Sequence, residues 1–292
     1  MRERTLSAVV IVPVVVVAVA AGGIGVGILV LVLAALGARE VERLLPAAGR
    51  PIVVGGVVGG SLVLVAAATA PAILSSALVA WPEPAREVAA RVGAVDGVAL
   101  VGVVAAGLAL LTFARRDPAA GFAAWSATLF GAVYVGLLGA VAILTTQATD
   151  PPSFERVFWP ERRWVLVLLA GVWSFDTGAY LVGRAIGRRP FLRWISPQKT
   201  LEGVAGGVVA ATAGVALVLA LSSQPWPEAL LLGPLLGIAA QAGDLAESLL
   251  KRAAGAKDAG SLIPGHGGVL DRVDSILFAA PVLAVWVGLV HG

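Results

Sequence analysis

The chain has 292 residues, of which 59% are hydrophobic and only 13% are charged, and its formal net charge is +3. Soluble domains carry about 25% charged residues, so this composition excludes an ordinary water-soluble globule, and its apolar content excludes a disordered chain. The absence of cysteine excludes disulfides and thiolate metal sites. We therefore predict an all-α, polytopic integral membrane protein in which any metal ion is bound by oxygen ligands.

Charge-poor apolar segments, each close to the roughly 20 residues that a helix needs to cross a bilayer, follow one another along the chain. Gly22 and Gly23 divide the first apolar run into two short segments. About nine spans are predicted, at 6–21, 24–37, 52–71, 92–113, 121–145, 164–182, 203–221, 229–250 and 273–290. Residues 72–81 follow Pro71 and are predicted to form a loop or an interfacial segment.

The basic residues predict the orientation of these spans. With nine spans and a cytoplasmic N-terminus, 16 of the 21 Lys and Arg residues fall on the cytoplasmic side. Membrane proteins normally show this excess of Lys and Arg inside. We therefore predict a cytoplasmic N-terminus, with the first apolar run forming a membrane hairpin rather than a cleavable signal peptide.

Residues 1–292 are predicted to form a single membrane domain with two unequal parts. Residues 1–145 are hydrophobic helices without distinctive chemistry, whereas polar residues gather inside or at the ends of the spans in 164–292. No internal repeat is evident, which argues against a transporter built from repeats. The 36 glycines permit close helix packing and are compatible with a homodimer, although the oligomeric state stays open.

Asp176 is the first acidic residue deep inside a span of the C-terminal part. A carboxylate at that depth costs several kcal/mol unless it is paired or hydrated. Asp176 is therefore a candidate functional residue, and the alternative is a structural partner for an arginine such as Arg184.

A polar stripe follows in the 229–250 span, where Asp244, Glu247, Ser248 and Lys251 fall at i, i+3, i+4 and i+7. This spacing places them on one face of a helix. Acidic and basic side chains inside a span are expected to face a water-filled cavity rather than lipid. The alternative is a ladder of ion pairs within the helix at the membrane surface.

The loop before the last span is rich in glycine and ends in two carboxylates, Asp271 and Asp274, on either side of Arg272. Carboxylates beside Lys and Arg are typical of sites for metal-bridged phosphates. Asp271 could instead only cap the last helix. His266 in the same loop is either an acid–base or phosphate-binding group or a hydrogen-bonded loop residue, and the sequence favours neither.

These segments resemble the bacterial phosphatidate cytidylyltransferases, also called CDP-diacylglycerol synthases. Every fixed position of a 27-residue pattern is matched, by Ser248, Lys251-Arg252, Lys257-Asp258, Gly260, Ile263-Pro264, His266-Gly267-Gly268 and Asp271-Arg272-Val273-Asp274. Gly243-Asp244-Leu245 and Asp176–Tyr180 also look like the family. Gln198 and Leu201 depart from it, because lysine and tryptophan are common at these two positions. The similarity covers about 176–275, whereas the first 145 residues resemble the family only in hydropathy.

The resemblance implies transfer of CMP from CTP to phosphatidic acid, giving CDP-diacylglycerol and pyrophosphate, in the inner membrane with the active site facing the cytoplasm. It implies Mg²⁺ as cofactor and the bilayer as partner, and no nucleic acid is expected. The hypothesis assigns magnesium to Asp244, Asp271 and Asp274, with Asp244, Lys251, Asp271 and Arg272 as the catalytic set. Substrate binding is assigned to Ser196, Lys199, Ser248, Arg252, Lys257, His266, Gly267 and Gly268.

The sequence leaves three alternatives to CMP transfer. A CTP-dependent lipid-alcohol kinase would transfer the γ-phosphate instead and release CDP. A cation or solute transporter would use Asp176 and Asp244 as ion sites, but the polar residues are biased to one side of the membrane. A scaffold without catalytic activity would need no such charges inside spans.

Overall fold

The computed structural model describes all residues except 1–11, 78–96, 147–161, 263–266 and 292. In the described ranges the secondary structure is helical and no strand is formed, although an isolated antiparallel bridge pairs Pro190 with Thr200. The prediction of an all-α protein is confirmed.

A helical stretch at 12–20 precedes the labelled helices. These are α2 (Gly22–Ala47), α3 (Gly56–Ala77), α5 (Gly97–Thr112), α6 (Pro118–Gly136), α7 (Gly139–Ile143), α8 (Arg163–Ile186), α9 (Leu201–Leu221), the short 3-10 helix η3 (Trp226–Glu228), α10 (Ala229–Ala253) and α11 (Leu270–Val290). In the described part of the chain, six helical segments are long and apolar enough to cross a membrane and two apolar helices are shorter. The polytopic class is therefore confirmed, and the number nine stays a prediction.

The first two predicted spans are separated where the glycine pair suggested, but the second is longer than expected. Ala21 forms a turn and Gly22 has a positive φ of 70°, so a new helix, α2, begins there. The predicted end at residue 37 is wrong, since α2 continues to Ala47. The polar residues beyond Gly37 do not end the helix because Val41, Leu44 and Leu45 continue its buried face.

Of the two alternatives predicted for the segment after Pro71, the loop is wrong over residues 72–77, because α3 passes through Pro71 and ends at Ala77. The interfacial segment stays a prediction. Proline removes one backbone donor from a helix, but membrane helices tolerate this where the freed carbonyl is satisfied by its surroundings. Residues 78–81 of the expected loop lie outside the described ranges.

Two compact units make up the chain. The first comprises the described parts of Met1–Thr146 and Leu250–Arg272, and the second those of Gln147–Leu249 and Val273–Gly292. The boundaries fall inside α10 and α11. The segment with Lys251 and Asp271 therefore groups with the N-terminal helices, whereas the sequence analysis assigned it to the C-terminal part. The prediction of one membrane domain stays a prediction.

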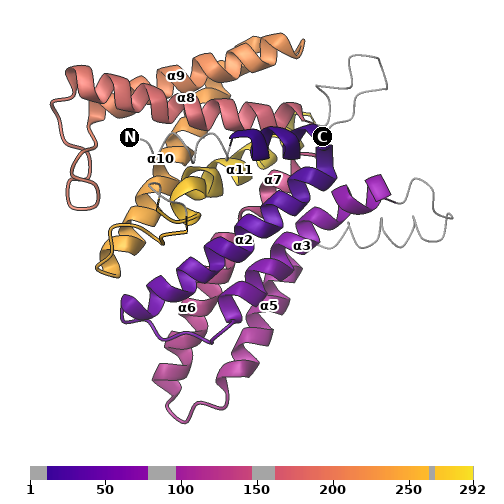
Figure 1. Ribbon diagram of the computed structural model, residues 1–292, viewed down its shortest axis with the longest axis vertical. Helices are drawn as coiled ribbons and strands as arrows, with labels where there is room; N and C mark the ends of the chain where they lie inside the picture. The colour runs from indigo at the N-terminus through magenta and orange to yellow at the C-terminus, as the bar shows by residue number, and fades with distance from the viewer. Residues whose placement is uncertain (1–11, 78–96, 147–161, 263–266, 292) are drawn as a thin grey trace. The chain divides into compact units, whose positions relative to one another are not determined.

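In the first unit, α2, α3, α5 and α6 lie side by side as a helical bundle (Figure 1). Small residues permit this packing: a Cβ atom on Gly131 of α6 would lie 3.0 Å from methyl groups of Val41 in α2 and Val57 in α3. The Asp117 carboxylate caps α6 by accepting the N–H of Ala119 at 3.0 Å. The bundle is the scaffold on which α2 presents its charged C-terminal turns.

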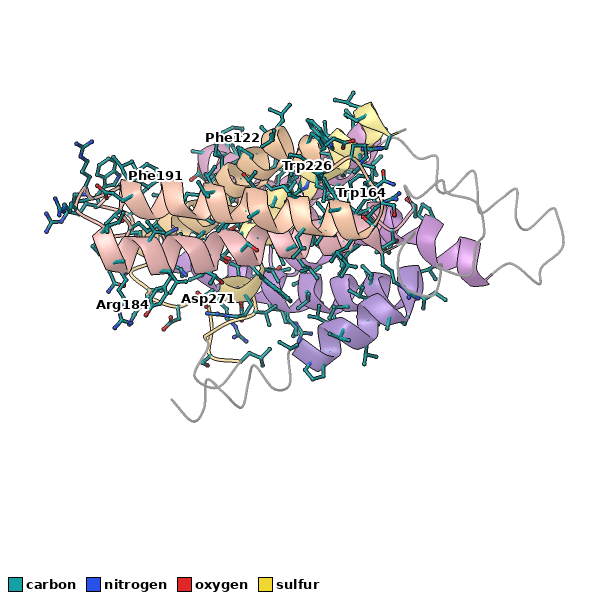
Figure 2. All side chains as sticks on the ribbon, turned by 90° about the horizontal axis from the view of Figure 1, so that it is seen from above. Phe122, Trp164, Arg184, Phe191, Trp226 and Asp271 are labelled. Carbon is teal, nitrogen blue, oxygen red and sulfur yellow. The ribbon has the colours of Figure 1, made fainter. Side chains whose placement is uncertain are left out.

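The second unit contains an antiparallel hairpin of α8 and α9, drawn side by side in Figure 1. The loop between them is fixed by hydrogen bonds from Phe191 N–H to the Lys199 carbonyl at 2.8 Å and from Leu201 N–H to the Arg189 carbonyl at 2.9 Å. Figure 2 shows Arg184 and Phe191 at this end of the hairpin and Trp164 toward the other end. The hairpin therefore presents the basic loop that carries Lys199.

Candidate active site

Asp271 lies in the first turn of α11 and accepts three hydrogen bonds within the first unit; Figure 2 labels it. Its Oδ1 atom lies 2.7 Å from the Lys251 ammonium, and Oδ2 accepts the N–H groups of Gly268 at 2.7 Å and Ala259 at 2.9 Å. The side chains of Asp271 and Lys251 are only 6% and 13% exposed. The pairing makes the carboxylate anionic and fixes its orientation.

The backbone on both sides of Asp271 requires glycine at two turns. Gly267 has a positive φ of 80°, and a Cβ atom there would lie 2.7 Å from Asp271 Oδ2. Gly255 has a positive φ of 65° and ends α10 in a Schellman motif, in which Ala256 N–H donates to the Lys251 carbonyl at 2.8 Å and Gly255 N–H to that of Arg252 at 3.1 Å. This turn lets Lys251 and Ala259 contact the same carboxylate.

The second polar cluster forms around Asp244 in the second unit. Its Oδ2 atom forms a close ion pair with the Lys199 ammonium, and its Oδ1 atom accepts a hydrogen bond from the Ser248 hydroxyl at 3.3 Å. The Asp244 side chain is 32% exposed, so its carboxylate is not fully enclosed by the protein. The structure thus brings together three predicted site residues, Lys199, Asp244 and Ser248.

Helices α10 and α11 approach each other closely beside Asp244. A Cβ atom on Gly243 would overlap the carbonyl oxygen of Asp274, so only glycine fits there without a shift of one helix. The Asp274 carboxylate accepts the N–H of Ser275 at 2.6 Å. The Gly243 contact therefore places the backbone of Asp274 next to the turn of α10 that carries Asp244.

We expect Gly243→Ala to lower the free energy of unfolding by about 1–3 kcal/mol, the usual cost of overpacking, because the new methyl group meets rigid backbone. The matched control is Gly107→Ala in α5, where a Cβ atom meets nothing within 4 Å and alanine favours the helix by up to ~1 kcal/mol. The measurement is the thermal unfolding midpoint in detergent. Equal midpoints for the two variants would contradict the close approach of α10 and α11.

The remaining predicted site residues are distributed as follows. Arg252, Lys257 and Arg272 are exposed, and Ser196 is half-buried in the loop between α8 and α9. His266 lies outside the described residues, with Ile263, Pro264 and Gly265. Asp176 is exposed on α8, and Arg184, its suggested partner, donates to the Tyr180 hydroxyl at 3.0 Å.

The polar stripe on α10 is less uniform than its spacing predicted. Glu247 is fully buried, with 0% exposure, whereas Asp244, Ser248 and Lys251 are half-buried. The four residues of the stripe therefore differ in exposure, and the water-filled cavity stays a prediction.

Glu40 on α2 is a buried charged residue that the sequence analysis missed. It is 4% exposed and accepts the N–H groups of Val269 and Leu270, directly before and at the start of α11. A signal was present, because Glu40 occupies the same helical stripe as Gly37, Val41 and Leu44, which are all buried. A glutamate at a core position of a helix indicates a specific partner.

Across the described residues, no three His, Cys, Asp or Glu side chains form a group able to hold a metal ion. The fit to magnesium therefore rests on donor chemistry. Asp244 and Asp271 each pair with a lysine and so present anionic oxygens, the ligand type that Mg²⁺ prefers.

Helices that can span a membrane, together with two carboxylates that each pair with a lysine, define a polytopic membrane protein with two polar clusters. A model of the cytidylyltransferase family matches residues 2–290. The chain belongs to the cytidylyltransferase family, which confirms the resemblance predicted from the sequence.

Relatives named phosphatidate cytidylyltransferase match parts of the chain. The Brucella suis protein is 40% identical over 185 residues, which cover 63% of this chain and 63% of the relative. The Bacillus subtilis protein is 48% identical over 119 residues, or 38% of this chain and 42% of the relative. The Synechocystis protein is 39% identical over 188 residues, or 56% and 62%. Each match spans less than two thirds of the relative's length.

Proposed function

We propose that this protein transfers CMP from CTP to phosphatidic acid, forming CDP-diacylglycerol and pyrophosphate. Family membership and the names of the relatives support this reaction. The observation that carries the proposal is the Asp271 cluster, in which the motif residues Lys251, Gly268 and Asp271 contact one another through hydrogen bonds.

The reaction needs charge stabilisation more than it needs a base. A phosphate oxygen of phosphatidic acid attacks the α-phosphorus of CTP, the bond between the α-phosphorus and the bridging oxygen breaks, and pyrophosphate leaves with the electron pair. A phosphate monoester is already largely ionised near neutral pH, since its second pKa is about 6. The protein must therefore bring two anions together and stabilise the charge that develops.

The lysines and arginines of the motif have this role in our proposal. Lys251 and Lys199 are each paired with a carboxylate, which holds the ammonium groups in place before substrate binds. Arg252, Lys257 and Arg272 are exposed and are proposed to bind the triphosphate and the lipid phosphate, with Ser196, Ser248, His266, Gly267 and Gly268 completing the site.

We propose magnesium as the cofactor, with Asp244, Asp271 and Asp274 as its carboxylate ligands. When bound, the ion would neutralise phosphate charge and polarise the α-phosphorus. In this structure Asp244 pairs with Lys199 and Asp271 pairs with Lys251, so each of these two carboxylates presents anionic oxygens of the kind that a divalent cation prefers.

We further propose that the protein resides in the cytoplasmic membrane with this site facing the cytoplasm, where CTP is available. The excess of Lys and Arg on the predicted inner side supports that orientation. Phosphatidic acid would reach the site laterally from the bilayer. The homodimer stays a prediction.

The test is product identification with purified protein, magnesium, phosphatidic acid and CTP labelled at either the α- or the γ-phosphorus. We expect the α-label in a CDP-lipid and the γ-label in pyrophosphate. A γ-label in the lipid, with release of CDP, would replace the proposal by the lipid kinase. Ion flux in liposomes without CTP, and no labelled lipid, would replace it by a transporter.

A further inference from the structure

Glu40 connects the N-terminal helices to the start of α11 within the first unit. Its Oε1 atom accepts the N–H of Val269 at 3.0 Å, and its Oε2 atom accepts the N–H of Leu270 at 2.7 Å. The first N–H groups of a helix have no partner inside the helix. A glutamate some 230 residues away in sequence therefore supplies the cap of α11.

The chain segments around Asp271 lie directly on the Glu40 carboxylate. A Cβ atom on Gly260 would lie 2.5 Å from Glu40 Oε1, and one on Gly268 would lie 2.6 Å from both carboxylate oxygens. Two glycines, one on each side of the loop, thus let the backbone approach a buried anion. A larger residue at either glycine would collide with the Glu40 carboxylate, so the backbone at residues 260 and 268 is in direct contact with Glu40.

Glu40 and Asp271 divide three consecutive N–H groups between them. Gly268 donates to Asp271 at 2.7 Å, and the next two residues, Val269 and Leu270, donate to Glu40. Gly260 follows Ala259, which also donates to Asp271, at 2.9 Å. A shift of the backbone at 268–270 would therefore move the Gly268 N–H that Asp271 accepts together with the two N–H groups that Glu40 accepts.

We propose that Glu40 is a positioning residue for CMP transfer: it holds the backbone of residues 268–270 and thereby keeps Asp271 oriented. This inference rests on the proposed function. If substrate phosphates bind Lys251, or a metal ion binds an Asp271 oxygen, the hydrogen bonds of Glu40 would still hold the backbone of residues 268–270 in place. Glu40 acts through Asp271 and does not itself contact substrate.

A helix cap alone would not need such a residue. Ser, Thr, Asp or Asn beside the helix start caps locally, whereas a buried carboxylate has to recover a large desolvation cost through its hydrogen bonds. The same helix offers a comparison, because Glu42 accepts the N–H groups of Val57 and Val58 at 3.0 and 3.3 Å and so caps α3. Glu42 supports the bundle and contacts no residue of the motif in these hydrogen bonds.

The test compares Glu40→Gln with Glu42→Gln. Glutamine keeps one acceptor oxygen, so Glu40→Gln loses one of its two cap hydrogen bonds, because each oxygen of Glu40 accepts one N–H group. Glu42→Gln can keep both of its hydrogen bonds, because one oxygen of Glu42 accepts both N–H groups. We expect Glu40→Gln to lower kcat about 10- to 100-fold per folded protein, the loss typical of a misplaced catalytic group, with KM for CTP changed less than about threefold. Glu42→Gln removes a charge from the same helix and is expected to leave kcat within about twofold of the wild type.

Hydrogen exchange of the amides of Gly268, Val269 and Leu270 provides a readout that does not depend on the reaction. We expect faster exchange at all three in Glu40→Gln and unchanged exchange in Glu42→Gln. If the wild type makes no CDP-lipid, the proposed function fails, and the exchange rates still decide whether Glu40 holds this backbone. Wild-type kcat per folded protein, or unchanged exchange in Glu40→Gln, would overturn the proposal.

Gly260→Ala displaces the Glu40 carboxylate from the other side and replaces Glu40→Gln if that variant does not fold. It is expected to lower kcat in the same way, and the two changes combined should lower kcat by less than the product of the single effects, because both disturb one contact. Fully multiplicative effects would show that the two residues act independently and would contradict the proposal.

Discussion

Replacing Asp271 by asparagine is expected to lower CMP transfer by about 10²- to 10³-fold, the range seen when one preorganised electrostatic group is removed from an active site. The change removes the negative charge that pairs with Lys251 and leaves one oxygen to accept the N–H groups of Gly268 and Ala259. The measurement is the rate of CDP-lipid formation per folded protein.

Asp271→Asn should still fold, although with a lower unfolding midpoint. The amide oxygen of the asparagine can still accept the N–H groups of Gly268 and Ala259. The flexible Lys251 side chain can turn its ammonium toward water. The matched control is Asp117→Asn, since Asp117 caps α6 with its carboxylate and asparagine caps a helix equally well. Activity of Asp271→Asn near that of Asp117→Asn would remove Asp271 from the catalytic set.

Asp244→Asn is expected to cause a loss of similar size, with little change in stability. Its ion pair with Lys199 is partly exposed, at 32% and 22% for the two side chains, and such pairs contribute about 0–1 kcal/mol to folding. The reaction loses a carboxylate proposed to bind magnesium. The measurement is the rate of CDP-lipid formation as a function of magnesium concentration.

Lys199→Met separates two roles of Asp244. If Asp244 only held Lys199 in place, both variants would lose the same activity and need the same magnesium concentration for half-maximal rate. Our account expects that concentration to rise at least about tenfold in Asp244→Asn, which corresponds to about 1.4 kcal/mol of binding free energy, and to stay near the wild-type value in Lys199→Met.

The helices were predictable because apolar length alone limits what crosses a bilayer. The predicted spans at 203–221 and 229–250 correspond to α9 and α10, which begin and end within three residues of the predicted bounds. Helix ends were less accurate. Arg39 and Glu42 extend α2 and Pro71 lies inside α3, because charge and proline show where apolar sequence stops but not where backbone hydrogen bonding stops.

Site residues were predictable where the pattern was local. Ser248 and Asp244 are one helical turn apart, and their hydrogen bond follows from that spacing. Glu40 was missed because its partners, Val269 and Leu270, are backbone N–H groups far along the chain. The pattern of side chains in a sequence does not indicate which backbone N–H groups a carboxylate accepts. In addition, charged residues that follow a span, as at the end of α2, usually indicate only the orientation of that span in the membrane.

The central claim, that the motif carboxylates bind a divalent cation, is tested most directly by Mn²⁺ binding to the purified protein, followed through the electron paramagnetic resonance signal of the free ion. We predict saturable binding by the wild type and by Asp117→Asn, and at least about tenfold weaker binding by Asp244→Asn and by Asp271→Asn, or about 1.4 kcal/mol. Equal Mn²⁺ affinity in all four proteins would contradict the account.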